Sequence, residues 1–176
     1  MEKSKIKDGF LGQKMIVLPD SIRKELHTIC ESFYITDIGF YPNAQHHYRS
    51  RKKGIEEYIF IYCIEGKGNL KVDGQLIHVL PNTYHIIHRN TLHEYNSDKN
   101  DPWSIYWMHF GGNLTDNLYE RYMEHRSNNG SIAFERSKIN LFNEIFHMYK
   151  TEYTVPKLEY SNILGLNFIS SFVYTS

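Results

Sequence analysis

Residues 34–110 contain short segments of alternating or continuous apolar residues separated by turn signals, and this pattern predicts short β-strands joined by tight turns. Alternation is typical of strands because successive side chains point to opposite faces of a sheet. Turn signals occur at Glu65-Gly-Lys-Gly68, Asp73-Gly74 and Pro81-Asn82. The predicted strands are Tyr34–Phe40, Tyr58–Ile64, Asn69–Val72, Gln75–Leu80, Thr83–His88, His93–Ser97 and Trp103–Phe110. Short strands at this spacing indicate a small β-barrel or jelly roll.

The strand predicted at Trp103–Phe110 has two apolar faces. One face carries Trp103, Ile105, Trp107 and His109, and the other carries Ser104, Tyr106, Met108 and Phe110. A strand that is apolar on both faces is covered on both sides, as in a barrel or a sandwich. Each indole N–H needs a hydrogen-bond partner when it is buried, whereas Leu, Val and Ile need none. The two tryptophans therefore indicate either the wall of a pocket or simple core packing.

After Gly111-Gly112 the apolar residues recur with the spacing of helices. Asn113 or Thr115 can cap a first helix. Ser137 can cap a second, and Pro156 suits the first turn of a third. Their apolar positions are Leu114, Leu118, Tyr122 and Met123, then Ile139, Phe142, Ile145, Phe146 and Tyr149, then Leu158, Ile163, Leu164, Leu166, Phe168, Ile169, Phe172 and Val173. The fold class predicted from these elements is α+β, mainly β, with a barrel followed by two or three C-terminal helices.

The chain is expected to consist of an N-terminal arm (1–33), a barrel (34–112) and a helical region (113–176). The apolar residues of the last helix spread over a wide sector of its circumference, which is more than one neighbouring helix can cover. We therefore expect a symmetric homodimer formed by antiparallel packing of this segment. The last helix shows no C-cap signal before Ser176, so we expect the sequence to continue as a linker or a further segment.

Composition limits the classes of function. A chain of 176 residues suits one domain, and 20 basic residues balance 20 acidic ones. A chain with balanced charge lacks the excess of positive charge that binds nucleic acid, so we expect no direct DNA binding by these residues. Its 2 cysteines imply no disulfide framework. The first ten residues lack the apolar core of a signal peptide and no apolar run spans a bilayer, so we expect a cytoplasmic protein.

Several motifs follow one another in a definite order. They are Arg51-x-x-Gly54-x-x-x-Tyr58, Gly66-x-Gly68, Asp73-Gly74, His93-x-Tyr95 and Trp107-x-x-Phe110. In order and spacing they resemble the ligand-sensing domain of AraC-type transcription regulators, over about residues 34–176. The resemblance implies a cupin-like barrel followed by helices that dimerise. Complete members continue into a half with two helix-turn-helix motifs, which nothing in this sequence matches, so DNA would be bound only through a half absent from this chain.

The resemblance also implies a set of ligand-binding residues. Arg51 matches an arginine that binds sugar hydroxyls, and a guanidinium can bridge two adjacent oxygens because its five donors form a fixed fork. Tyr95 matches a pocket position that can hydrogen-bond a hydroxyl. Trp107 can offer its flat face to the C–H side of a sugar ring. Without the resemblance, Arg51 would be interpreted as part of a solvated basic loop and the two aromatic residues as core.

Three further residues are assigned to the pocket. Tyr41, in Gly39-Phe-Tyr-Pro42, can supply another pocket group. Ile105 stands where the arabinose regulator has a histidine, so that polar contact is absent here. His93 lies where the distal histidine of cupins is expected.

A metal site is not expected, although the chain has 10 histidines. Metal-binding cupins use His-x-His with a following glutamate and one more histidine. His46 and His47 are adjacent and would point to opposite faces of a strand, and His85 and His88 also diverge. His93 alone does not make a tetrahedral or octahedral site. We therefore expect no cofactor and no catalysis, and no nucleophile motif such as Gly-x-Ser-x-Gly occurs.

The function predicted is that of an effector-sensing and dimerisation domain of a bacterial AraC-type regulator. Its effector would be a sugar or a similar small polar molecule, including small carboxylated ones. Binding would reposition the N-terminal arm or the dimer helices, by as much as the ligand prefers one state over the other. Two alternatives remain open at this point: a metal-dependent cupin enzyme, such as a dioxygenase or a sugar isomerase, and a dimerisation module whose pocket has lost its ligand.

Overall fold

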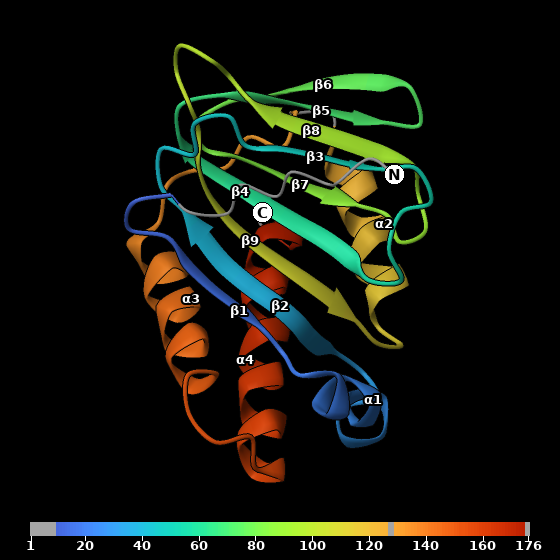
Figure 1. Ribbon diagram of the computed structural model, residues 1–176. Coiled ribbons are helices and arrows are strands. Elements are labelled where there is room, and N and C mark those ends of the chain that lie inside the picture. The colour runs from blue at the N-terminus through green and yellow to red at the C-terminus, as the bar shows by residue number, and fades with distance from the viewer. Residues whose placement is uncertain (1–9, 127–128, 175–176) are drawn as a thin grey trace, which may run out of the picture.

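The computed structural model describes residues 10–126 and 129–174. The beginning of the predicted N-terminal arm and the end of the last predicted helix lie outside these residues. Two antiparallel sheets face one another, and helices α3 and α4 cover the outer face of one of them (Figure 1). The predicted fold class is confirmed, since the chain is mainly β with helices at its C-terminal end.

Nine strands form the two sheets within the described residues. The five-stranded sheet has the order β1 (Lys14–Val17), β2 (Tyr34–Tyr41), β9 (Ser104–Gly111), β4 (Tyr58–Glu65) and β7 (Thr83–Ile87). The four-stranded sheet has the order β3 (Tyr48–Arg51), β8 (His93–Ser97), β5 (Gly68–Val72) and β6 (Gln75–Val79). All seven predicted strands are present, with bounds within one residue of those expected. Strands β1 and β3 were not predicted, because each has only 4 residues and the β3 sequence, YRSR, is polar.

The five-stranded sheet separates two hydrophobic cores. On β4, Tyr58 and Phe60 pack with the helices, whereas Ile59 and Ile61 lie between the sheets. On β9, Tyr106, Met108 and Phe110 join the helix-covered core. Ile105 and Trp107 join the core between the sheets, as does Trp103, which directly precedes the strand. The prediction that this strand is covered on both faces is therefore confirmed.

The hairpin between β5 and β6 turns at Asp73-Gly74, as predicted. Asp73 has φ 47° and Gly74 has φ 80°. Two consecutive residues with positive φ form the type I′ turn, whose twist matches that of the flanking strands. The register Val72↔Gln75 follows from this two-residue loop.

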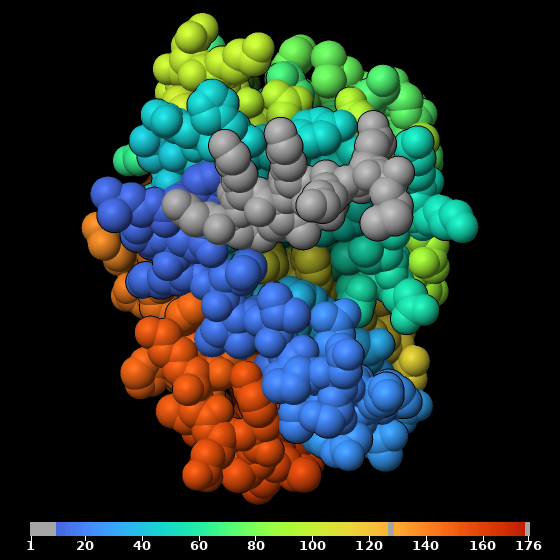
Figure 2. Space-filling model, in the orientation of Figure 1, coloured from blue at the N-terminus to red at the C-terminus, as the bar shows by residue number. Residues whose placement is uncertain are grey.

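Four helices complete the described chain. The predicted C-terminal helices are α2 (Thr115–His125), α3 (Arg136–Met148) and α4 (Val155–Val173). Helix α1 (Asp20–Ile29) was not predicted and lies within the segment expected to be an arm. In Figure 2, α1 in blue and α4 in orange-red lie beside each other at the lower end of the molecule. Among residues 10–126 and 129–174, no helix is long and apolar enough to cross a bilayer.

Helix α4 packs under the five-stranded sheet and closes the core of its own chain. Phe168, Ile169, Phe172 and Val173 are buried there, and the Phe168 ring contacts those of Phe60 and Phe142. Ile163, by contrast, is 64% exposed. Most of the apolar surface that suggested a dimer is thus covered within one chain, and a narrower exposed strip remains on α4.

Candidate functional site

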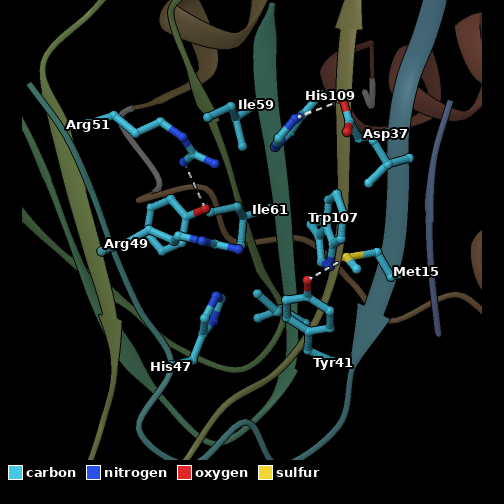
Figure 3. Close-up of a pocket in the computed structure, with 13 residues that line it drawn as sticks. Met15, Asp37, Tyr41, His47, Arg49, Arg51, Ile59, Ile61, Trp107 and His109 are labelled. Atoms are coloured by element: carbon cyan, nitrogen blue, oxygen red, sulfur yellow. Dashed lines mark hydrogen bonds and ion pairs between the residues drawn. The ribbon is translucent and has the colours of Figure 1, made fainter. Parts of the chain in front are cut away.

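A cavity of about 260 Å³ lies between the two sheets. This volume is slightly below the usual range of small-molecule sites, which begins at about 300 Å³. Side chains from both sheets line it, as Figure 3 shows. The described lining residues are Met15, Val17, Asp37, Tyr41, His47, Arg49, Arg51, Ile59, Ile61, Tyr95, Ile105, Trp107 and His109. In Figure 2 this face of the molecule is hollowed between the blue segment of β1 and α1 and the teal segment that precedes β4.

Five of the six residues expected to bind a ligand line this one cavity. Arg51 and Tyr95 come from the four-stranded sheet, and Tyr41, Ile105 and Trp107 come from the five-stranded sheet. The chain therefore brings together residues that are far apart in sequence. The Tyr41 hydroxyl donates to Met15 Sδ at 3.1 Å, which ties β1 to the cavity wall.

Arg51 is held in place by two neighbours on β8. Its Nη1 donates to the Tyr95 hydroxyl at 3.2 Å and to His93 Nε2 at 3.2 Å. The other ring nitrogen, His93 Nδ1, donates to the Thr91 carbonyl at 2.8 Å, and this bond assigns the tautomer in which Nε2 accepts. Burial lowers the pKa of His93, against the opposing hydrogen bond to Thr91, so the ring stays a neutral acceptor near pH 7.

His93 lies behind Arg51 and is not one of the described lining residues of the cavity. Both of its ring nitrogens are engaged, one with Thr91 and one with Arg51. Its ring stacks on that of Tyr95, with centroids 6.0 Å apart and an interplanar angle of 5°. The structure thus places His93 in contact with Arg51, where it orients the guanidinium.

Trp107 fits into the wall because residue 39 has no side chain. A Cβ on Gly39 would lie 2.5 Å from the Trp107 ring and 2.7 Å from the Lys14 carbonyl oxygen. The indole is 8% exposed, and its Nε1 has no hydrogen-bond partner among the described residues. Trp103, by comparison, is fully buried and its Nε1 donates to His47 Nδ1 at 3.2 Å. One tryptophan therefore serves as core and the other as cavity wall.

His47 and Arg49 were missed in the sequence. Together with Arg51 they occupy every second position, and all three line the cavity. This spacing of two was the signal that could have identified them, because it is the spacing of side chains on one face of a strand. Burial, followed by the charges of Arg49 and Arg51, lowers the pKa of His47 to about 3. The imidazole is therefore neutral near pH 7.

Asp37 and His109 form a buried polar pair on the other side of the cavity (Figure 3). His109 Nδ1 lies 3.2 Å from Asp37 Oδ2, Thr36 Oγ1 donates to the same oxygen at 2.6 Å, and Arg23 Nη1 lies 3.4 Å from it. Arg23 also pairs with Glu57 at 2.8 Å. Burial alone would raise the pKa of Asp37, but His109, Thr36 and Arg23 together lower it below its usual value. The carboxylate is thus charged and already well satisfied.

Metal-ligating residues do not cluster in the described part of the chain. Within residues 10–126 and 129–174, no three His, Cys, Asp or Glu side chains are grouped so that they could hold a metal ion. His46 is exposed and His47 is buried, so the adjacent pair diverges. His93 and His109 are each engaged by the neighbours described above.

Comparisons with known proteins give a family match and a curated relative. The family described as AraC-like ligand binding domain matches residues 38–151. The MmsAB operon regulatory protein of Pseudomonas aeruginosa is 29% identical over 109 residues, which are 54% of this chain and 33% of that protein. The chain thus spans about a third of the length of this curated relative.

Two solved structures are similar in outline at low sequence identity. YhaK from Escherichia coli is 7% identical, with a TM-score of 0.44 over 57% of this chain and 45% of that one. A Cupin 2 conserved barrel domain protein from Salinispora arenicola is 13% identical, with a TM-score of 0.41 over 62% of this chain and 82% of that one.

Proposed function

Because the chain belongs to the family of AraC-like ligand-binding domains, we propose that it is the effector-sensing and dimerisation domain of a bacterial transcription regulator. The effector is a small polar molecule, such as a sugar, that binds in the cavity between the sheets. The chain itself is not an enzyme. A regulator of this kind works in the cytoplasm and contacts DNA through a half that this sequence does not contain.

The observation that supports effector binding is the convergence of Arg51, Tyr95 and Trp107 on one cavity. A guanidinium, a hydroxyl and an indole that line one cavity supply both directional hydrogen bonds and an apolar surface. Most small-molecule sites combine a largely apolar wall with a few fixed polar groups. Tyr41 and Ile105 extend the same wall, and His93 fixes the orientation of Arg51.

Dimerisation is proposed through the exposed strip of α4. Tyr160 is 51% exposed and Ile163 is 64% exposed, and they lie one turn apart on the same face. Two copies of such a strip can pack antiparallel about a twofold axis. Because most of the helix already serves the core of its own chain, we expect a small interface and micromolar dissociation.

A thermal-shift screen of pentoses, hexoses and small acids tests effector binding. A ligand present at a hundredfold excess over its Kd adds about 2.7 kcal/mol to the stability of the folded state. Arg51→Ala should weaken binding of any such ligand by about 1.5–3 kcal/mol, the scale of a charged hydrogen bond. Arg121→Ala, which removes an exposed arginine of α2, is the matched control and should bind normally.

Two outcomes would contradict this proposal. If no compound stabilises the chain, or if both arginine variants behave alike, the cavity is not an effector site and the chain is a dimerisation module. A metal analysis of the purified protein tests the enzyme alternative separately. An occupancy near one zinc, iron or manganese per chain, with loss of the metal in His93→Ala, would favour a metal-dependent cupin enzyme.

A further inference from the structure

Arg51 presents an unoccupied edge of its guanidinium in the cavity wall. Its Nη1 is engaged with Tyr95 and His93. Among the described residues, Nε and Nη2 have no hydrogen-bond partner and Arg51 forms no ion pair. The N–H groups of Nε and Nη2 are parallel and coplanar, the geometry that matches the two oxygens of a carboxylate. Figure 3 shows this guanidinium extending toward Ile59 and the middle of the cavity.

Further donors line the same cavity. His47 Nδ1 accepts the Trp103 N–H at 3.2 Å, so the proton of the neutral imidazole is on Nε2, which makes that nitrogen a donor. The Tyr95 hydroxyl accepts from Arg51, and its own O–H can therefore donate to another group. Arg49 adds a second guanidinium to the same wall. The polar side of the cavity consists largely of donors.

Acceptors are scarce in comparison. Asp37 is the carboxylate among the described lining residues. It already interacts with Thr36, His109 and Arg23 through hydrogen bonds and an ion pair. A neutral sugar brings one O–H donor with every hydroxyl, and each buried donor without an acceptor destabilises the complex by about 1–3 kcal/mol. A ligand that offers only acceptors at its polar end avoids this penalty.

The remaining wall is apolar. Ile59, Ile61 and Ile105 line it from the five-stranded sheet, and Val17 lines it from β1. This surface suits a hydrocarbon group, and it offers no hydrogen bonds to the hydroxyl groups of a sugar ring. A cavity of about 260 Å³ also limits the ligand to a small molecule.

We infer that the cavity binds a small carboxylic acid as its anion. The carboxylate lies on the Nε–Nη2 edge of Arg51, and the hydrocarbon body lies against Ile59, Ile61 and Ile105. This inference rests on the proposed function, because it specifies the chemical class of the effector for that same cavity.

Matched pairs of compounds test the inference on the 176-residue chain. Isovalerate is compared with isovaleramide, benzoate with benzamide, and gluconate with glucose, by thermal shift and calorimetry at constant ionic strength. Inorganic phosphate serves as the anion without a carboxylate. We expect at least one acid to bind and its neutral partner to bind at least about tenfold more weakly, since the amide loses the charged hydrogen bonds.

Arginine variants then locate the carboxylate. Arg51→Met should weaken binding of the acid by about tenfold to a hundredfold. Arg51→Lys, which keeps the charge but lacks the fork, should give a smaller loss. Arg121→Met removes an exposed arginine and should bind the acid normally. The comparison of acid with neutral partner uses the unmodified chain, so it remains decisive if a variant fails to fold.

The outcomes separate this inference from the proposed function. If a neutral sugar or an amide binds as well as the acid, the carboxylate class is wrong and effector sensing stands. Preferential binding of inorganic phosphate would likewise overturn the carboxylate class alone. If no compound binds at all, both the inference and the proposed function fail.

Discussion

Arg51 and Asp37 lie on opposite sides of the cavity (Figure 3), and each also contacts a residue that does not line it. His93 contacts Arg51 from β8, and Arg23 contacts Asp37 from α1. The ion pair between Arg23 and Asp37 links the cavity to α1, because Asp37 itself lines the cavity. Substitution of His93 or Arg23 is therefore expected to change the orientation of the lining residue that each contacts.

Asp37→Asn should lower the free energy of unfolding by about 1–3 kcal/mol, the scale of charged hydrogen bonds lost from a buried site. The amide cannot neutralise Arg23, and it leaves the hydrogen bond from His109 weaker. Urea denaturation at pH 7 measures the change. Glu124→Gln is the control, because it removes an exposed ion pair with Arg121 and should leave the midpoint unchanged. Equal stability of Asp37→Asn and the unmodified chain would show that the carboxylate is not needed.

Helix α4 has two faces with different roles. One face carries Phe168 and Phe172, which pack on the five-stranded sheet. At Gly165 a Cβ would lie 2.6 Å from Ile35 Cδ1, which shows how closely the helix approaches β2. The other face exposes Tyr160 and Ile163. The first face stabilises the fold, and the second face is exposed on the surface of the chain.

Substitutions on the two faces of α4 should therefore have different effects. Phe168→Ala should destabilise the chain by about 3–5 kcal/mol, because a large buried side chain is removed from a packed core. Ile163→Lys should leave the unfolding midpoint nearly unchanged and convert the dimer to a monomer. Denaturation and light scattering at high concentration measure the two effects. A monomer in the unmodified chain at all concentrations would mean that α4 closes only its own core.

At the scale of the whole molecule, the fold buries neutral histidines, among them His47, His85 and His93. Burial is the main cause that lowers the pKa of His47 to about 3 and that of His85 to about 4. In the unfolded chain both groups titrate near their ordinary value of about 6.5. Below that pH the unfolded state binds more protons than the folded state, so acid favours unfolding.

The free energy of unfolding should therefore be nearly constant between about pH 7.5 and pH 8 and fall between about pH 6 and pH 4. Each histidine contributes a slope of up to about 1.4 kcal/mol per pH unit in this range. His85→Leu should reduce the slope by up to about 1.4 kcal/mol per pH unit, because His47 and His93 remain. His125→Gln, an exposed control, should retain the full slope. Urea denaturation across the pH range measures the slope, and an unchanged slope in His85→Leu would contradict the prediction.

The sequence alone determined most of the elements. Seven strands, the Asp73-Gly74 turn and the three C-terminal helices follow from the spacing of apolar residues and from turn chemistry. Both are local properties, because side-chain direction repeats every two residues in a strand and every 3.6 residues in a helix. The resemblance to a family added Arg51, Tyr95 and Trp107, which the structure brings to one cavity.

Only the tertiary structure decided what else forms that cavity and which surface remains for a partner. Asp37 and His109 are 72 residues apart, and they meet because the β2–β9 register pairs them. Strands β1 and β3 are too short to show a pattern and are defined by the strands they pair with. The apolar surface of α4 is likewise settled by the sheet that covers it. Strand pairing and helix packing depend on long-range contacts, which the pattern of neighbouring residues does not contain.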